Sequence, residues 1–207
     1  MNPATRWQHT FPLSNIQNLL IKRLRRLRKN TPTPKLGFGK DKLTGTYKPV
    51  FLTNSSGFGL DDVTTCEVFD FTTQRLRYVH PASHFTTNPH PNPVYLDGSL
   101  YWLTDCEVPK VLSFDLHTET FHVICNALFA HVLDPLSVTI CILDNRLCVS
   151  LRNWPTQDIW SFQYSSKTWA KMCSIDLTQN FFLVSGTQVC PVTYCNSGQA
   201  QVTTPRS

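Results

Sequence analysis

The chain has 207 residues, of which 41% are hydrophobic, 12% aromatic and only 16% charged, and its formal net charge is +5. This length is typical of one domain with tails, and the high aromatic content excludes a disordered or fibrous chain. Its longest apolar runs are far shorter than the roughly 20 residues of a membrane-spanning helix. The polar N-terminus has no apolar stretch typical of a secretion signal. We therefore expect an intracellular protein, nuclear or cytoplasmic, with no membrane partner.

Positive charge is concentrated near the N-terminus. Residues 1–48 carry 11 Lys and Arg and one acid, whereas the remainder has a net charge of −5. Residues 15–30 have the periodicity of a short basic helix, with Ser14 or Asn15 as its N-cap. Its predicted apolar face consists of Ile16, Leu19, Leu20, Leu24 and Leu27. The basic run 22–29 is either a binding surface for anions or nucleic acid, or a solvated segment beside the domain. Nothing else in the chain favours nucleic acid.

The cysteines form no Cys-x-x-Cys pair, and several lie inside apolar segments with strand character. Because the chain has no recognisable export signal, we expect reduced thiols that are mostly buried, rather than disulfides. The eight are Cys66, Cys106, Cys125, Cys141, Cys148, Cys173, Cys190 and Cys195.

A repeat dominates the chain beyond residue 36, where short alternating apolar runs are separated by turn residues. Three segments align without gaps: 68–79, 113–124 and 161–172. Each is a predicted hairpin, anchored in turn by Phe69, Phe114 or Phe162. After a turn rich in Thr and Ser, the second strand returns with Leu76, Phe121 or Trp169.

A second hairpin recurs upstream of the first, in residues 94–103 and 141–151. Asp97-Gly98 and Asp144-Asn145 tolerate positive φ, so each marks a tight turn. The unit is therefore two hairpins repeated about every 45–48 residues, which is the size of one β-propeller blade. We predict an all-β fold, an incomplete kelch-like propeller of about three four-stranded antiparallel blades.

The predicted blades fill only part of a ring. Blades two and three are expected at about 93–125 and 138–173. Blade one looks irregular, with a strand at 47–52 and a hairpin at 65–79, and a remnant of a fourth blade is expected at 181–194. We divide the chain into an N-terminal part (1–35), a propeller-like domain (36–194) and a flexible tail (195–207). An open ring leaves one blade face uncovered, so the chain is a fragment, dimerises or is marginally stable.

Several stretches, in this order, resemble the F-box-associated domain of plant F-box proteins. They are Asn2-Pro3-Ala4-Thr5-Arg6-Trp7, Leu36-Gly37-Phe38-Gly39 with Tyr47-Lys48, Cys66-Glu67-Val68-Phe69-Asp70, Asp97-Gly98-Ser99-Leu100-Tyr101-Trp102 and Ser113-Phe114-Asp115-Leu116. The resemblance implies a kelch-like propeller that selects proteins for a Skp1–cullin–F-box ubiquitin ligase. In that family a separate F-box binds the Skp1-like adaptor. No F-box pattern precedes the Asn-Pro stretch here, so we expect adaptor binding only if an F-box is present elsewhere.

No catalytic, cofactor or metal site is predicted, and we expect no enzyme. His80, His84 and His90 lie in a proline-rich loop that cannot form a helix, which disfavours a zinc site. Trp102, Trp160 and Trp169 occupy strand positions typical of a core rather than a carbohydrate platform. We expect a module that binds an unknown target protein through the loops 53–65, 80–93, 104–110, 126–137 and 152–158. The alternatives are a binder of anionic surfaces or nucleic acid through the basic run, or a non-functional fragment.

Overall fold

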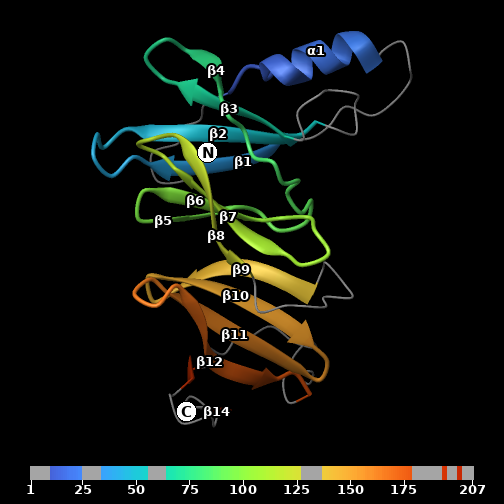
Figure 1. Cartoon of the computed structure of the whole chain (residues 1–207), viewed down its shortest axis with the longest axis vertical. Coiled ribbons are helices and arrows are strands. Elements are labelled where there is room, and N and C mark those ends of the chain that lie inside the picture. Colours follow the sequence, from blue (N-terminus) through green and yellow to red (C-terminus); the bar gives the residue numbers. More distant parts are fainter. Residues whose placement is uncertain are drawn as a thin grey trace, which may run out of the picture.

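Figure 1 shows the fold in a computed structural model that describes residues 10–24, 34–55, 64–126, 137–178, 193–194 and 200–201. One helix, α1 (Asn15–Leu24), precedes three four-stranded antiparallel sheets. Blade 1 consists of β1 (Lys35–Lys40), β2 (Tyr47–Asn54), β3 (Thr64–Asp70) and β4 (Arg75–Val79). Blade 2 consists of β5 (Val94–Leu96), β6 (Ser99–Leu103), β7 (Lys110–Asp115) and β8 (Thr120–Asn126). Blade 3 consists of β9 (Val138–Leu143), β10 (Arg146–Asn153), β11 (Thr156–Gln163) and β12 (Thr168–Asp176).

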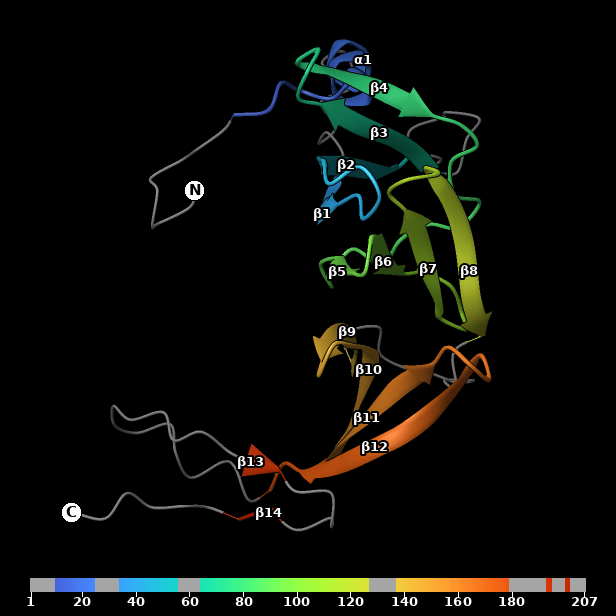
Figure 2. The same cartoon turned by 90° about the vertical axis from the view of Figure 1, so that its left-hand side faces the viewer.

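The three blades stack in an arc (Figure 2), with β1, β5 and β9 along its inner side and β4, β8 and β12 along its outer side. Neighbouring blades contact one another mainly through their inner strands, β1 with β5 and β6, and both of these with β9. The predicted incomplete propeller is confirmed. The division into 1–35, 36–194 and 195–207 stays a prediction, although β13 (Thr193–Tyr194) pairs with β14 (Ala200–Gln201) across its last boundary. Most of the predicted fourth-blade remnant lies outside the described residues.

Blade 1 is more regular than the sequence suggested. The sequence predicted only one strand in its first half, yet β1 pairs with β2 over the six residues Lys35–Lys40. The strand pattern of β1 is weak in the sequence because glycine, here Gly37 and Gly39, is a poor strand former. Their lack of a side chain has a packing reason, since a Cβ at Gly37 would lie 2.7 Å from Cδ1 of Leu100 in blade 2.

The repeat read from the sequence is confirmed in the register of the strands. In the outer hairpin of each blade the anchor phenylalanine faces the predicted return residue, in the pairs Phe69–Leu76, Phe114–Phe121 and Phe162–Trp169. Each of these three outer hairpin turns has one residue of positive φ at the equivalent position, namely Gln74, Glu119 and Lys167. The inner turns of blades 2 and 3 also have positive φ, at Asp97-Gly98 and Asp144-Asn145.

Each anchor phenylalanine is buried, and those of blades 2 and 3 point toward the preceding blade. Phe162 belongs to the cluster between blades 2 and 3, and Phe114 to the cluster between blades 1 and 2. In the described part of the chain no blade packs on Phe69, and Phe11 covers it there, with ring centroids 5.1 Å apart. Helix α1 lies over the same face (Figures 1 and 2).

The start of α1 is fixed by two sets of hydrogen bonds. Of the two predicted caps, Ser14 and Asn15, Ser14 caps the helix. Its Oγ accepts a hydrogen bond from the backbone N–H of Gln17, while the Gln17 side chain accepts one from the N–H of Ser14. The buried Glu67 carboxylate of β3 accepts hydrogen bonds from the N–H groups of Asn15 (2.8 Å) and Ile16 (3.3 Å). A carboxylate is favoured at a helix N-terminus. Glu67 therefore anchors the helix to blade 1.

The helix contacts the blade through a narrower stripe than expected. Ile16 and Leu20 are buried, but Leu19, placed on the apolar face by the periodicity, is 46% exposed. That part of the prediction is wrong, because Leu19 lies on the flank of the contact stripe. The side chains of Leu24 and Leu27 and the predicted extension to residue 30 lie outside the described residues.

The five cysteines whose side chains the structure describes are free thiols, as predicted: Cys66, Cys106, Cys141, Cys148 and Cys173. Two of them, Cys66 and Cys148, are fully buried, and the others are half-buried. Burial raises the pKa of Cys66 well above its usual range and that of Cys148 to about 11. These two thiols are therefore poor nucleophiles at neutral pH.

We expect Gly39→Ala to loosen the junction between blades 1 and 2. A Cβ at Gly39 would lie 2.5 Å from Cδ2 of Tyr95 and 2.6 Å from Cδ1 of Leu116, closer than carbon atoms approach. The free energy of unfolding should fall by about 1–3 kcal/mol, measured by urea unfolding with tryptophan fluorescence. Thr139→Ala, at an exposed position of the inner strand of blade 3, should change it by at most about 0.5 kcal/mol. Equal midpoints for wild type and Gly39→Ala would contradict the expectation.

Candidate functional site

The propeller presents two rims, because successive strands reverse direction. The turn rim carries the hairpin turns β1–β2, β3–β4, β5–β6, β7–β8, β9–β10 and β11–β12. The loop rim carries the connections β2–β3, β4–β5, β6–β7, β8–β9 and β10–β11. All five loops predicted to bind a target belong to the loop rim. Residues 56–63 and 127–136 of these loops lie outside the described residues.

The longest described loop, residues 80–93, is held by both blades that it connects. The Asn54 side chain at the end of β2 donates to the carbonyl of Thr87 and accepts from its N–H, both at 2.9 Å. On the blade 2 side, the N–H of Asn88 donates to the carbonyl of Leu103, and that of Asp105 donates to the carbonyl of Thr86. These bonds fix the loop, so its surface is organised before any partner binds.

A cavity of about 350 Å³ lies between this loop and the outer strand of blade 2. Its walls combine apolar and imidazole side chains, including His84, Phe85, Phe121, His122 and Val123. Val123 is 40% exposed on β8, the strand at the outer end of its sheet. We name this concavity and the loop beside it the loop-rim groove. Its apolar walls and few polar groups suit a side chain of another protein.

The histidines singled out in the sequence do not converge. His84 lines the loop-rim groove, whereas the His80 ring lies 5.9 Å from that of Tyr78 on β4. Within the described part of the chain, no group of three or more His, Cys, Asp or Glu side chains is arranged to hold a metal ion. Trp102 and Trp169 are buried, as predicted for core positions, and Trp160 packs partly buried against the cluster between blades 2 and 3.

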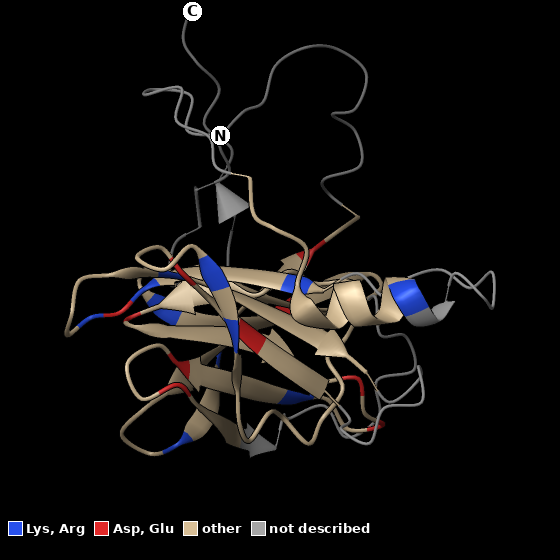
Figure 3. Cartoon of the chain, turned by 90° about the horizontal axis from the view of Figure 1, so that it is seen from above, with Lys and Arg blue, Asp and Glu red and all other residues tan. Residues whose placement is uncertain are grey.

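Charged residues of both signs are scattered along the described part of the chain (Figure 3). Only the start of the basic run is described: Lys22 is exposed on α1, and residues 25–29 lie outside the described residues. Anion binding by that run therefore stays a prediction. None of the described helices has the length and hydropathy needed to cross a membrane.

Blades 1 and 2 are joined at the turn rim by a network of charges. Lys48 Nζ lies 2.9 Å from Oε1 of Glu119 and 3.5 Å from Oδ2 of Asp41, and Arg77 pairs with the same Glu119 oxygen. His117 Nδ1 lies 3.3 Å from Oδ2 of the buried Asp41. Because Glu119 and His117 belong to the β7–β8 turn and the other three residues to blade 1, the network connects the two blades.

The network keeps its carboxylates ionised. Burial opposes ionisation of Asp41, but hydrogen bonds from Thr44, from the N–H of Leu43 and with His117 outweigh it, so the pKa of Asp41 is well below its usual range. Burial likewise opposes ionisation of Glu119, and the hydrogen bonds from Arg77 and Lys48 lower its pKa below the ordinary 4.5. The two cations Lys48 and Arg77 match the two carboxylates Asp41 and Glu119. This balance suits a structural link between the blades rather than a binding site.

We expect Glu119→Gln to reduce the pH dependence of stability. A carboxyl with a lowered folded pKa stabilises the fold above its unfolded pKa, and that stabilisation is lost as the pH falls below it. The urea midpoint of the wild type should therefore fall between about pH 6 and pH 3, and the variant should show a smaller fall. At neutral pH the variant should lose about 1 kcal/mol.

Asp97→Asn serves as the control for this expectation, because it removes an exposed ion pair with Lys42. Such a pair contributes little, so the control should keep the stability and pH profile of the wild type. Identical pH profiles of stability for Glu119→Gln and the wild type would contradict a stabilising role of Glu119 in the charge network between blades 1 and 2.

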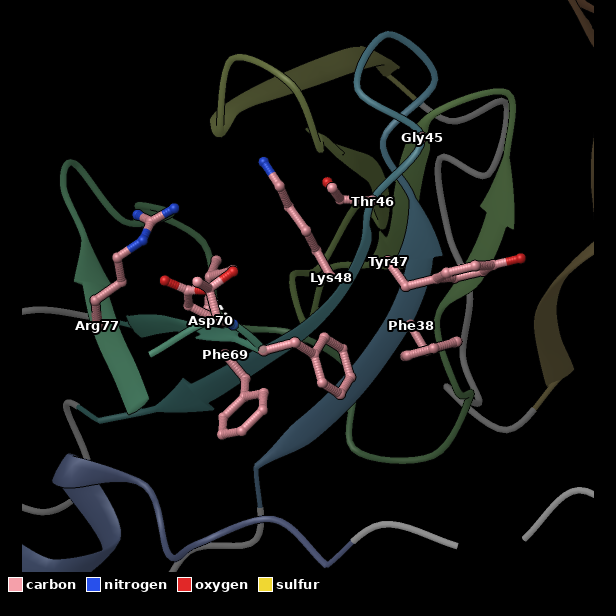
Figure 4. Close-up of a pocket in the computed structure, with 11 residues that line it drawn as sticks. Phe38, Gly45, Thr46, Tyr47, Lys48, Phe69, Asp70 and Arg77 are labelled. Carbon is pink, nitrogen blue, oxygen red and sulfur yellow. Dashed lines mark hydrogen bonds between the residues drawn. The ribbon is translucent and has the colours of Figure 1, made fainter. Parts of the chain in front are cut away.

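A larger cavity, of about 980 Å³, opens on the turn-rim side of blade 1 (Figure 4). One wall is aromatic: Phe38 stacks on Tyr47 with centroids 5.5 Å apart, and Phe69 packs edge-on against Phe71. Lys48 and Arg77, with Asp70, Thr46 and Thr72, supply the polar lining. We name it the blade-1 pocket.

The sequence-based expectation missed the blade-1 pocket, since none of its lining residues lies in a predicted binding loop. A signal for it was nevertheless present in the repeat. Phe69 is the counterpart of Phe114 and Phe162, which pack against a preceding blade, whereas no blade precedes blade 1 among the described residues. The apolar opening lies beside Phe69 on that side of blade 1.

Three stacked four-stranded blades, repeated along the chain and wound in an arc, define a protein of the β-propeller class. The family model for the F-box associated beta propeller domain matches residues 5–199. The chain belongs to this family, as its resemblance to plant F-box proteins predicted.

Curated relatives from Arabidopsis thaliana agree with the family match. An F-box protein is 57% identical over 80% of the chain, an F-box/LRR-repeat/kelch-repeat protein 55% over 92%, and another F-box protein 45% over 93%. The matches cover 53%, 50% and 56% of these relatives, so the chain spans about half of their length. Among solved structures, TolB from Acinetobacter baumannii matches 61% of the chain and 29% of its own, at 11% identity and a TM-score of 0.39. We base no assignment on that match.

Proposed function

We propose that the chain is a target-binding module of a Skp1–cullin–F-box type ubiquitin ligase, and that it holds a target protein in the loop-rim groove. The observation that carries the proposal is the loop 80–93, which is fixed by Asn54 and by blade 2 beside an apolar cavity. A rigid scaffold with a fixed, accessible loop is typical of protein recognition. Membership of the F-box associated family supports the ligase context.

The groove suits an apolar side chain on an extended segment of the target. Phe85 and Phe121 supply the apolar contact, and Lys110 covers the Phe85 ring from 4.5 Å. A segment lying along the outer edge of β8 would add backbone hydrogen bonds to that contact. Binding of this kind requires no catalytic group, so the chain acts as a receptor in the nucleus or cytoplasm and not as an enzyme. The Skp1-like adaptor would bind an F-box, in line with the family resemblance.

The test is photo-crosslinking in plant cells, with a photoreactive amino acid at position 84 of the chain. We expect one or a few proteins to be captured, and their ubiquitination to rise with the level of the chain. Val123→Glu places a charge in the groove and should abolish both effects. Leu43→Glu, at a 74% exposed position on the turn rim, should change neither. Capture that is equal in Val123→Glu and the wild type would overturn the proposal.

A further inference from the structure

Two thiols lie side by side on the face of blade 3 that points away from blade 2. On β10, Leu147 and Val149 belong to the cluster between blades 2 and 3, so Cys148 between them lies on the opposite face. Cys141 of β9 is the direct partner of Cys148 in the hairpin register and therefore shares that face. Side chains directly opposite in an antiparallel pair have Cβ atoms about 4.5–5.5 Å apart. The two thiols are therefore neighbours.

A thioether joins this pair from a third strand. The register of β11 and β12 shifts between Ile159 and Trp160, and Met172 is an extra residue with no register partner in β11. A bulge of this kind re-aims a side chain. Met172 Sδ lies 3.7 Å from Sγ of Cys148, and the β11 residue between the two strands, the register partner of Cys148, is the small Ser161. Three sulfur atoms from β9, β10 and β12 therefore gather on one face.

The spacing of these sulfur atoms suits one shared metal ion. Metal–sulfur bonds in proteins are about 2.3 Å long, so two sulfurs bound to one ion at an angle of about 110–120° lie about 4 Å apart. The 3.7 Å between Cys148 and Met172 is close to this separation. Cys148 is buried, whereas Met172 is 38% exposed and Cys141 is half-buried, so an ion can reach the buried thiol from the side of the other two sulfurs.

The donor atoms select the class of ion. Thiolate and thioether are soft ligands and suit Cu(I), whereas Mg²⁺ and Ca²⁺ take oxygen ligands. Structural zinc sites have four thiolate, imidazole or carboxylate ligands. In the described part of the chain no further Cys, His, Asp or Glu side chain joins the two thiols to make such a set. Two thiols and one thioether therefore favour a soft monovalent ion with three sulfur ligands.

We propose that Cys141, Cys148 and Met172 form a binding site for Cu(I). Binding displaces the protons of both thiols, because only thiolates are strong metal ligands. Burial, Cys141 and Asp144 raise the pKa of Cys148, to about 11, and Arg146 acts in the opposite direction. The same guanidinium would offset the single net negative charge of two thiolates and one Cu(I). The inference does not depend on the proposed function.

No metal site was predicted from the sequence, because the three ligands follow no recognised motif. Only the bulge in β12 brings Met172 to Cys148.

The first test titrates Cu(I) into the full chain without oxygen, in competition with the chelator bicinchoninate. We expect one tightly bound ion per chain, with the release of two protons and a thiolate-to-copper charge-transfer band in the ultraviolet. Met172→Leu keeps every thiol and should raise the dissociation constant of Cu(I) at least about tenfold, and Cys141→Ser at least about a hundredfold. Cys106→Ser, which removes a half-buried thiol from a loop of blade 2, should leave it unchanged.

The second test uses stability, because an ion that binds only the folded chain raises its free energy of unfolding. Cu(I) should raise the urea midpoint of the wild type and of Cys106→Ser, and should have little effect on Met172→Leu and Cys141→Ser. Both altered ligands are partly exposed, so these variants should fold, which their urea curves without Cu(I) verify. No Cu(I) binding in competition with bicinchoninate, or equal affinity in the wild type, Met172→Leu and Cys141→Ser, would overturn the proposal.

Discussion

Phe114→Ala is expected to lower the free energy of unfolding by about 3–5 kcal/mol, a larger loss than we expect for any other single substitution in this chain's blade junctions. The Phe114 ring is fully buried in the cluster between blades 1 and 2, 4.8 Å from the ring of Phe121. Its removal leaves a cavity between two rigid sheets that cannot close without separating Leu100 and Val68 from their neighbours. Urea unfolding monitored by circular dichroism measures the loss.

Phe38→Ala is the matched control for this prediction. It removes the same side chain from an inner strand of the neighbouring blade, at a position that is 48% exposed. We expect a loss of about 1 kcal/mol or less. A similar loss for the two variants would mean that the blade 1–2 cluster does not dominate the stability of the arc.

The second large effect is expected for Glu67→Ala, which should lower the free energy of unfolding by about 2–4 kcal/mol. The change leaves the N–H groups of Asn15 and Ile16 without their acceptor in a buried site. Because α1 contacts blade 1 through a narrow stripe, we expect the helix to open locally before the blades unfold. Hydrogen exchange of the α1 amides should accelerate, while that of β6 and β7 should change less.

Two further variants separate the charge from the shape of Glu67. Glu67→Gln keeps an oxygen acceptor of similar size and should lose less stability than the alanine variant. Glu67→Leu restores the residue type found at the corresponding position of blade 2, Leu112, two residues before the anchor phenylalanine. Glu67→Leu should weaken the attachment of α1 to blade 1 as much as Glu67→Ala does. Unchanged protection of the α1 amides in all three variants would contradict the role of Glu67.

These effects bear on function because blades 1 and 2 together carry the proposed target contact. The loop-rim groove depends on the relative position of blades 1 and 2, since the loop 80–93 is bound to both through Asn54 and Leu103. A weaker blade 1–2 junction should therefore also weaken target capture.

The sequence by itself determined the blade repeat and its turns. The anchors Phe69, Phe114 and Phe162, and turns such as Asp97-Gly98, are local signals, because strand alternation and positive φ are properties of neighbouring residues. For the same reason the sequence narrowed the helix cap to Ser14 or Asn15, and the hydrogen bond to Gln17 decides for Ser14. The sequence did not predict β1, because glycine disfavours a strand. The reason for its glycines is the packing of blade 2 side chains on them, which only the fold shows.

The tertiary structure alone decided what lies next to what. Glu67 reads as an ordinary polar strand residue, and only the placement of α1 makes it a buried helix anchor. The sequence likewise placed recognition in five separate loops, and only the fold brought the loop 80–93 against β8 and left the aromatic side of blade 1 open. Such contacts join residues far apart in the chain. Their energies depend on burial and distance, neither of which local periodicity encodes.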